Sequence, residues 1–226
     1  MNILVVAAHP DDEVLGCGGT IAKHSAAGHN VSILILGEGI TSRFSDPKQA
    51  DKKDLDALHS TASQVGKFLG AKDVTLAKLP DNRFDTVPLL DIVKIVEEHV
   101  ERVKPEIVYT QHGGDLNVDH ACTFRSVLTA TRPMAGTPVK KVLAYRVGSS
   151  SEWAFEQFAP VFHAQVFEDI SKTIEKKVQA MQMYESEARA FPHPRSPEAL
   201  RATASYWGSV SGLTAAEPFT LVRELA

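Results

Sequence analysis

Four polar side chains follow the apolar segment 2–8: His9, Asp11, Asp12 and Glu13. The imidazole of His9 and the carboxylate of Asp12 stand three residues apart in a turn, so both can converge on a metal ion. Asp11, between them, is then free to accept a proton from water. Any one of these residues could be polar only because loops face solvent. Four of them directly after a buried strand indicate a metal-dependent active site.

A second polar cluster follows another apolar segment, 106–110. It consists of His112, Asp115, Asn117, Asp119 and His120. Two neighbouring strand ends can together supply three protein ligands to a zinc ion and leave a fourth position open for water. We choose His9, Asp12 and His120 as these ligands. A histidine at a helix start is often only a cap or a surface residue, so the assignment of His120 depends on its pairing with the first cluster.

Short apolar runs alternate with helical patterns along the first two thirds of the chain. Strands are expected at 2–8, 31–36, 74–79, 106–110 and 141–147, with helix starts at Asp46 and Thr86 among the connections. This alternation predicts an α/β fold, a three-layer, Rossmann-like and mostly parallel sheet with helices on both faces. The polar loops then gather at the carboxyl edge of the sheet, where such folds bind ligands.

The last third of the sequence has a different pattern of predicted elements. It contains a strand candidate at 164–167, a helix at 171–190, a proline-rich joint, and a helix at 197–209. We interpret these elements as a cap over the strand ends. The chain is thus expected to be a single domain, 1–226, with an α/β core at 1–150 and a cap with closing helices at 151–226.

The composition limits the classes of partner. The 226 residues are 43% hydrophobic and 23% charged, which is enough for one sizeable core. A formal net charge of -4 gives no basic surface for a nucleic acid or an anionic membrane. We expect a cytoplasmic protein, because there is no apolar run of a membrane span's length, no signal-peptide pattern, and only two cysteines.

The glycine-rich turn after the first strand must be tested as a dinucleotide site. Glu38 follows it at about the spacing of a ribose-binding acid. However, Gly16, Gly18 and Gly19 do not form the G-x-G-x-x-G pattern, and the acidic residues 11–13 would repel a pyrophosphate. Close packing of the helix explains these glycines better.

Two motifs together resemble the LmbE/PIG-L family of zinc-dependent N-acetylglucosaminyl deacetylases. They are AHPDDEVLGCGGTIAKH at 8–24 and DLNVDH at 115–120, and the resemblance extends to YES at 184–186 and HPRS at 193–196. By motif, it implies that His9, Asp12 and His120 are the zinc ligands. It also implies that Asp11 is the general base. The family fold agrees with the α/β architecture expected above.

The resemblance also suggests residues that bind the substrate. Arg43, in the motif ITSR, resembles an arginine that binds substrate in relatives, and Asp81 and Asn82 lie in a loop that borders the site there. From the expected cap, His193 and Arg195 would complete the ring of polar groups around the metal. These groups suit sugar hydroxyls or an anionic aglycone.

One position departs from the family pattern. Relatives often place a histidine three residues before the last ligand, and this chain has Asn117 there. An amide can donate a hydrogen bond to an oxyanion but cannot carry a proton at neutral pH. Asp11 would then serve both proton transfers, or His112 or His193 would substitute.

The implied reaction is metal-assisted hydrolysis of an amide. Asp11 accepts a proton as water, activated by Zn²⁺ or another divalent ion, attacks the acetyl carbonyl. Asn117 and the ion would stabilise the oxyanion, while Asp115 and Asp119 hold the loop and the imidazole in place. The expected partner is a small N-acetylated sugar or glycoconjugate, and a homo-oligomer is compatible with the sequence.

Two other functions use the same residues. A zinc-dependent hydratase could add water to the double bond of a small unsaturated acid, and it would release no acetate. The chain could also be a non-enzymatic metal-binding module, but Asp11 and the polar groups expected around the metal would then have no function.

Overall fold

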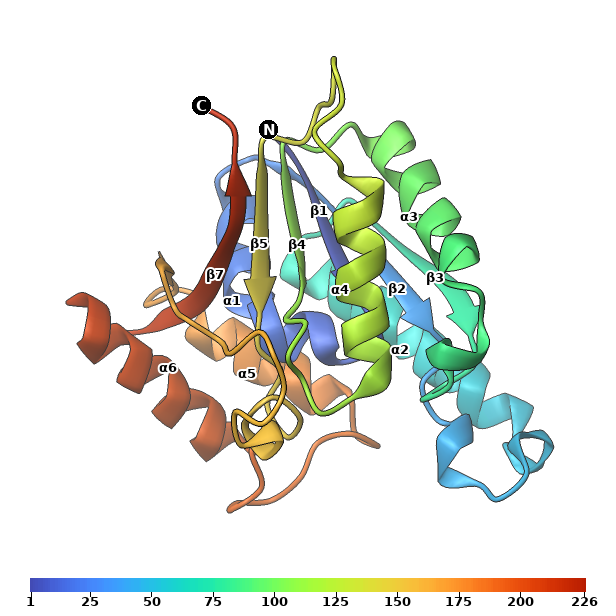
Figure 1. The fold of residues 1–226 in the computed structure, drawn as a ribbon. Helices are drawn as coiled ribbons and strands as arrows, with labels where there is room; N and C mark the ends of the chain where they lie inside the picture. The colour runs from blue at the N-terminus through green and yellow to red at the C-terminus, as the bar shows by residue number, and fades with distance from the viewer.

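A seven-stranded sheet forms the middle layer of the computed structural model, which describes residues 1–226 apart from the side chain of Pro47 (Figure 1). Its strands are β1 (Asn2–Ala7), β2 (Asn30–Gly37), β3 (Asp73–Leu79), β4 (Ile107–Gln111), β5 (Lys141–Tyr145), β6 (Val166–Asp169) and β7 (Ala216–Glu224). Their order is β3-β2-β1-β4-β5-β7-β6. Strands β1 to β5 pair in parallel, and β7 is antiparallel to both of its neighbours.

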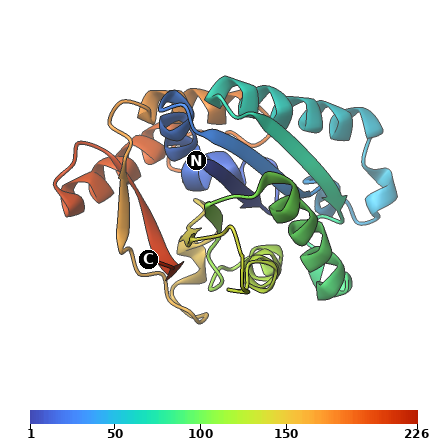
Figure 2. The same cartoon turned by 90° about the horizontal axis from the view of Figure 1, so that it is seen from above.

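Helices cover both faces of this sheet. They are α1 (Asp12–Ala26), α2 (Lys52–Leu69), α3 (Leu89–Val103), α4 (Val118–Ala130), α5 (Ile174–Met183) and α6 (Pro197–Ser211). Figure 2 shows α1, α2 and α5 on one side and α3 and α4 on the other. The predicted three-layer α/β fold is therefore confirmed. Among the described residues, no helix combines the length and the apolarity that crossing a membrane would require.

From Ile3 onward strand β1 is buried on both of its faces, which explains its apolar sequence there. Alternate side chains of the strand and of the residue after it enter two separate cores, Ile3, Val5 and Ala7 on the α1 side and Leu4, Val6 and Ala8 on the α3 side. A central parallel strand therefore anchors both helical layers at once. The loop that follows β1 thus starts from a strand that is packed on both faces.

The order of the strands creates a crevice at the end of β1. Strand β1 pairs with β2 on one side and with β4 on the other, so the connections leave β1 and β4 in opposite directions. Open α/β sheets bind ligands at this switch point, outside the carboxyl ends of the strands. The topology thus brings the loop after β1 beside the loop after β4.

The glycines of the first helix permit close packing, as the sequence suggested. A Cβ placed on Gly16 would lie 2.1 Å from the ring of Tyr145 on β5, and one on Gly19 would lie 2.8 Å from Ile170. Neither position can carry a side chain without moving its neighbour. Glycine here allows α1 to approach the sheet and the segment before α5.

The C-terminal third differs from the sequence-based expectation. Strand β7 was not predicted, and with β6 it extends the same sheet to which the first five strands belong. The buried Glu217 interrupts the apolar pattern of β7, and Lys177 Nζ on α5 compensates its charge at 2.6 Å. The apolar sequence pattern of β7 therefore did not reveal this strand, which tertiary contacts stabilise. The division at residue 150 stays a prediction.

Three predicted helix boundaries were also wrong. Helix α3 begins at Leu89 and not at Thr86, which instead ends a short 3₁₀ helix, Phe84–Thr86. Helix α5 spans Ile174–Met183, much less than the predicted 171–190, and the chain then turns at Tyr184. Helix α2 begins at Lys52 and not at Asp46, because Asp51 accepts a hydrogen bond from the backbone N–H of Lys53 and caps it. The shorter α5 leaves residues 184–196 as a connection that borders the carboxyl edge of the sheet.

Candidate metal centre and active site

A polar pocket of about 310 Å³ opens at the carboxyl ends of β1 and β4. Most of the predicted site residues line it: His9, Asp11, Asp12, Arg43, Asp81, Asn82, Asn117, His120, His193 and Arg195. The fold therefore gathers residues from loops after β1, β2, β3 and β4 and from the connection after α5. Asp115 and Asp119 lie behind this lining, in contact with its histidines.

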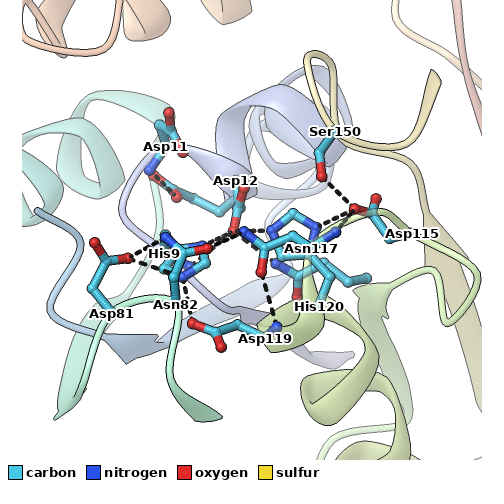
Figure 3. A network of polar contacts seen from close by, with 12 residues as sticks. His9, Asp11, Asp12, Asp81, Asn82, Asp115, Asn117, Asp119, His120 and Ser150 are labelled. Carbon is cyan, nitrogen blue, oxygen red and sulfur yellow. Dashed lines mark hydrogen bonds and ion pairs between the residues drawn. The ribbon is translucent and has the colours of Figure 1, made fainter. Parts of the chain in front are cut away.

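Two imidazoles and one carboxylate converge at the floor of the pocket (Figure 3). His9 Nδ1 and His120 Nε2 each lie 3.3 Å from Asp12 Oδ2. One ligand atom from each residue fits within 4.8 Å of the others, so the set could hold a metal ion. Two imidazole nitrogens and a carboxylate oxygen form a donor set that Zn²⁺ accepts, with one position left for water or substrate.

A second group of possible ligands shares His9. It consists of His9, Asp81 and Asp119, and it would use the opposite ring nitrogen. This group offers one imidazole and two carboxylates, and Asp119 lies behind the pocket lining. The first group offers two imidazoles and one carboxylate, all three of its residues line the pocket, and imidazole suits Zn²⁺. These differences favour the first group as the metal centre.

The outer nitrogens of both histidines face carboxylates. His9 Nε2 lies 2.9 Å from Asp119 Oδ2, and His120 Nδ1 lies 3.1 Å from Asp115 Oδ1. A histidine that ligates a metal commonly has its other ring nitrogen on a carboxylate, which fixes the tautomer and the ring orientation. Ser150 and Ser151 in turn donate to Asp115. The surroundings therefore orient one nitrogen of each ring toward Asp12.

The electrostatics of this group favour bound cations. Burial lowers the pKa of His120, but Asp12 and Asp115 outweigh it and raise that pKa to about 9. Burial also opposes the charge of Asp12, yet His120 and His9 lower its pKa below the ordinary value. Without an ion, protons on the imidazoles neutralise the carboxylates. A metal ion would take the place of these protons.

Asp11 occupies an unusual backbone position at the start of α1. Its φ of +109° is one that residues with side chains rarely adopt, and such strain often marks a functional position. The carboxylate of the buried Glu13 accepts from the backbone N–H of Asp11 and from the hydroxyl of Tyr184, so it supports this turn from behind. Arg195 Nη1 donates to Asp11 Oδ2 at 2.6 Å. Burial raises the pKa of Asp11, and Arg195 acts against that rise.

Asn117 has a structural role that its sequence position did not reveal. It caps α4, because its Oδ1 accepts from the backbone N–H of Asp119 at 2.8 Å. Its Nδ2 donates to Asn82 Oδ1 at 2.8 Å. One amide N–H of Asn117 has no partner among the described residues and is the only one that an oxyanion could take.

The two histidines considered as substitutes lie in different places. His112 is buried against Phe162, with ring centroids 5.2 Å apart, and does not line the pocket. His193 lines the pocket, and its ring packs edge-on to Trp153. Burial and the nearby Arg195 and other cations lower the pKa of His193, so it is neutral at pH 7. Of these two histidines, only His193 is therefore placed to contact a substrate in this pocket.

A family model described as PIG-L, GlcNAc-PI de-N-acetylase, matches residues 4–131, more than half of the chain. The protein belongs to the PIG-L family. The matched region contains both motifs on which the resemblance rested. The curated relatives of this PIG-L family member include the uncharacterized deacetylase YaiS of Escherichia coli K12, which is 26% identical over 176 residues, covering 76% of this chain and 83% of that protein.

Solved structures share the fold of this PIG-L family protein. The N,N'-diacetylchitobiose deacetylase of Pyrococcus horikoshii superposes with a TM-score of 0.77 at 18% identity, covering 98% of this chain and 83% of that one. The 4-carboxy-2-hydroxymuconate hydratase GalB of Pseudomonas putida KT2440 superposes with a TM-score of 0.76 at 21% identity, covering 100% and 98%. At these identities the superpositions show the fold alone.

Sequence reasoning missed several residues of this PIG-L family site, among them Gln111 and Glu187. Gln111 Nε2 donates to Asp12 Oδ2 at 2.8 Å, and its place directly after an apolar run was an available signal. Glu187 accepts hydrogen bonds from Arg43 at 2.6 Å and from Arg195 at 3.0 Å. No sequence pattern indicated Glu187, because Arg43 lies far away along the chain and Arg195 lies on an irregular turn.

Proposed function

We propose that this protein is a metal-dependent hydrolase that removes the acetyl group from an N-acetylated amino sugar or glycoconjugate. The observation that carries the proposal is the presence of Asp11 beside His9, Asp12 and His120 in one polar pocket. The family description and the deacetylase relative support this activity. The family description, which names an N-acetylglucosamine derivative, supports a sugar as the substrate.

His9, Asp12 and His120 would hold the metal ion, for which Zn²⁺ suits the two imidazoles and one carboxylate. When bound, the ion would supply Lewis acidity, which lowers the pKa of a coordinated water and draws charge from the acetyl carbonyl oxygen. Asp115 and Asp119 would keep the two imidazoles oriented through the contacts described above.

Asp11 would act as the general base. It accepts a proton from the water as the water oxygen bonds to the acetyl carbon. The carbon–nitrogen bond then breaks, and protonated Asp11 returns the proton to the leaving nitrogen, so the products are acetate and an amino sugar. The contact with Arg195 occupies Oδ2, and Oδ1 has no partner in the part of the chain that the structure describes. Oδ1 is therefore the oxygen available for this transfer.

The oxyanion and the sugar would be bound by the pocket walls. Asn117 can direct its remaining amide N–H to the oxyanion. His193 Nδ1 accepts from the backbone N–H of Arg195, so the neutral ring carries its proton on Nε2 and can donate a hydrogen bond into the pocket. Arg43, Asp81 and Asn82 line the same pocket and suit sugar hydroxyls. Asp81 and Asn82 also hold each other and the loop after β2, since Asn82 Nδ2 donates to Asp81 Oδ1 and Ser42 Oγ.

A second candidate function is hydration of a small unsaturated acid. The observation in its favour is the superposition of the entire chain on a hydratase. A water activated in the same way could add across a double bond, with Asp11 as the base. The family description and the relative named above favour the deacetylase over this alternative.

In the decisive experiment, the Zn²⁺-loaded protein is incubated with a panel of N-acetylated sugars and glycosides, and the acetate and free amine formed are measured. We expect equal amounts of acetate and free amine from at least one N-acetylglucosamine derivative, and no acetate release after chelation of the metal. Unsaturated dicarboxylic acids in parallel reactions, followed by their ultraviolet absorbance, test hydration. Loss of that absorbance without any acetate release would replace the deacetylase by the hydratase.

A further inference from the structure

The carboxylate of Glu187 joins two arginines across the wall of the pocket. Glu187 follows the end of α5 and is only 5% exposed. Its oxygens accept from Arg43 Nη2, in the loop after β2, and its Oε2 also accepts from Arg195 Nη1 at 3.0 Å. The backbone N–H of Glu187 donates to Tyr184 O at 2.8 Å, which fixes the turn that carries it. A buried carboxylate with two guanidinium partners is firmly placed.

Arg195 has three acceptors around its planar guanidinium. Its Nη1 donates to both Asp11 Oδ2 and Glu187 Oε2, and its Nε donates to Ser149 Oγ at 2.8 Å. A rigid planar group with contacts on two sides cannot rotate without losing one of them. Glu187 therefore shares the same nitrogen that Arg195 offers to the proposed base.

Sharing this nitrogen limits how Arg195 can bind Asp11. An arginine alone with a carboxylate prefers a bidentate pair, in which two nitrogens take both carboxylate oxygens. Here Glu187 and Ser149 hold the guanidinium so that Asp11 is bound through Oδ2 alone. The other oxygen, Oδ1, stays available to the pocket.

We infer that Glu187 is a positioning residue, which acts through Arg195 to keep Asp11 Oδ1 free for proton transfer. This inference rests on the proposed function for its consequence in turnover, while its geometric consequence can be measured without any substrate. Glu187 also holds Arg43, so one buried carboxylate sets both the base and an arginine of the pocket wall.

The test compares Glu187→Gln with the matched control Glu185→Gln in the Zn²⁺-loaded full chain. Glu185 lies two residues away on the same turn and is exposed. For Glu187→Gln we expect kcat to fall by about 10- to 100-fold, the scale of a displaced catalytic group, with one metal ion still bound. Glu185→Gln should keep the kcat of the wild type. A folded, metal-loaded Glu187→Gln with unchanged kcat would overturn the inference.

A double-mutant cycle separates positioning from a general loss of stability. If Glu187 acts through Arg195, adding Glu187→Gln to Arg195→Lys should cost no further turnover, because the lysine cannot form the same contacts. Losses that multiply in the double variant would show that Glu187 acts by another route. The melting temperatures of all variants identify any that simply unfold.

A crystal structure of metal-loaded Glu187→Gln shows the contact between Arg195 and Asp11 directly, without any measurement of activity. We expect the guanidinium of Arg195 to rotate and to bind both oxygens of Asp11. If the Asp11 and Arg195 contact stays as in the wild type, the inference is wrong even where turnover changes. If the wild type releases no acetate from any sugar, the proposed function fails, and this structure still decides the inference.

Discussion

His9 Nε2 lies 2.9 Å from Asp119 Oδ2, although 110 residues separate them in the chain. This contact joins the loop after β1 to the first turn of α4. It occupies the outer nitrogen of His9, so the other nitrogen, Nδ1, faces Asp12. The two halves of the sequence signature thus orient one another before any ion binds.

The first prediction concerns the metal ligands. Alanine at His9, Asp12 or His120 removes one of three donors, so each variant should lose most of its bound divalent ion, while the wild type holds about one ion per chain. Elemental analysis after dialysis measures this. Asp81→Ala is the control from the competing ligand group and should retain the ion. Full metal content in all three ligand variants would refute the assignment.

The second prediction concerns pH. The pKa of His120 in the metal-free protein is about 9, and a protonated imidazole cannot bind a metal. Zn²⁺ affinity should therefore increase from pH 6.5 to pH 9, and binding at pH 7 should release protons. Calorimetry in buffers of different ionisation enthalpy measures the number released. Zero proton release at pH 7 would contradict the charged His120.

The same shift predicts how the metal-free protein responds to pH. The folded-state pKa of His120 lies above its ordinary value of 6.5, so protonation stabilises the fold fully below pH 6.5. This contribution is lost as the pH rises through 9. In thermal unfolding with a chelator present, the melting temperature should therefore fall as the pH rises through 9. The fall should be smaller in His120→Gln.

The third prediction concerns the base. Asp11→Asn keeps the shape of the side chain but removes the proton acceptor, so turnover should fall by at least ~100-fold while the metal is retained. Acetate release and metal content are measured on the same sample. Nearly normal turnover would mean that Asp11 is not the proton acceptor.

The fourth prediction concerns Asn117. Alanine there removes both the oxyanion donor and the cap of α4, so kcat should fall roughly 10- to 1000-fold. The lost cap should cost about 1 kcal/mol of stability. Asn117→Ser is the matched control, because serine restores the cap without the amide donor. Asn117→His should be tolerated. A silent Asn117→Ala together with a crippling His112→Ala would assign the role to His112.

The fifth prediction concerns Arg43. Its guanidinium lines the pocket and is held by Glu187, and we propose that it contacts the substrate. Arg43→Ala should mainly raise KM and leave kcat close to that of the wild type. Steady-state kinetics on the substrate found in the panel checks this. A fall in kcat with unchanged KM would instead indicate that Arg43 acts with Glu187 and Arg195 in positioning Asp11.

Local sequence was sufficient for the first five strands and for the fold class. Strand β1 is apolar from Ile3 to Ala7 because both of its faces are buried there, and the polar residues begin where it ends. The rule that parallel strands share a carboxyl edge then brought His120 near His9. The pocket contains both residues, so this part of the site could be expected from patterns alone.

Only the tertiary structure decided the partners of each polar atom. The buried Glu217 of β7 pairs with Lys177 of α5, and Glu187 pairs with arginines that follow β2 and end the connection after α5. Such contacts have no local periodicity, because they form between side chains that come together only after the sheet and its helices have packed. The sequence by itself therefore determined which residues gather at the strand ends. The packed fold determined which oxygen and which nitrogen of those residues face the pocket.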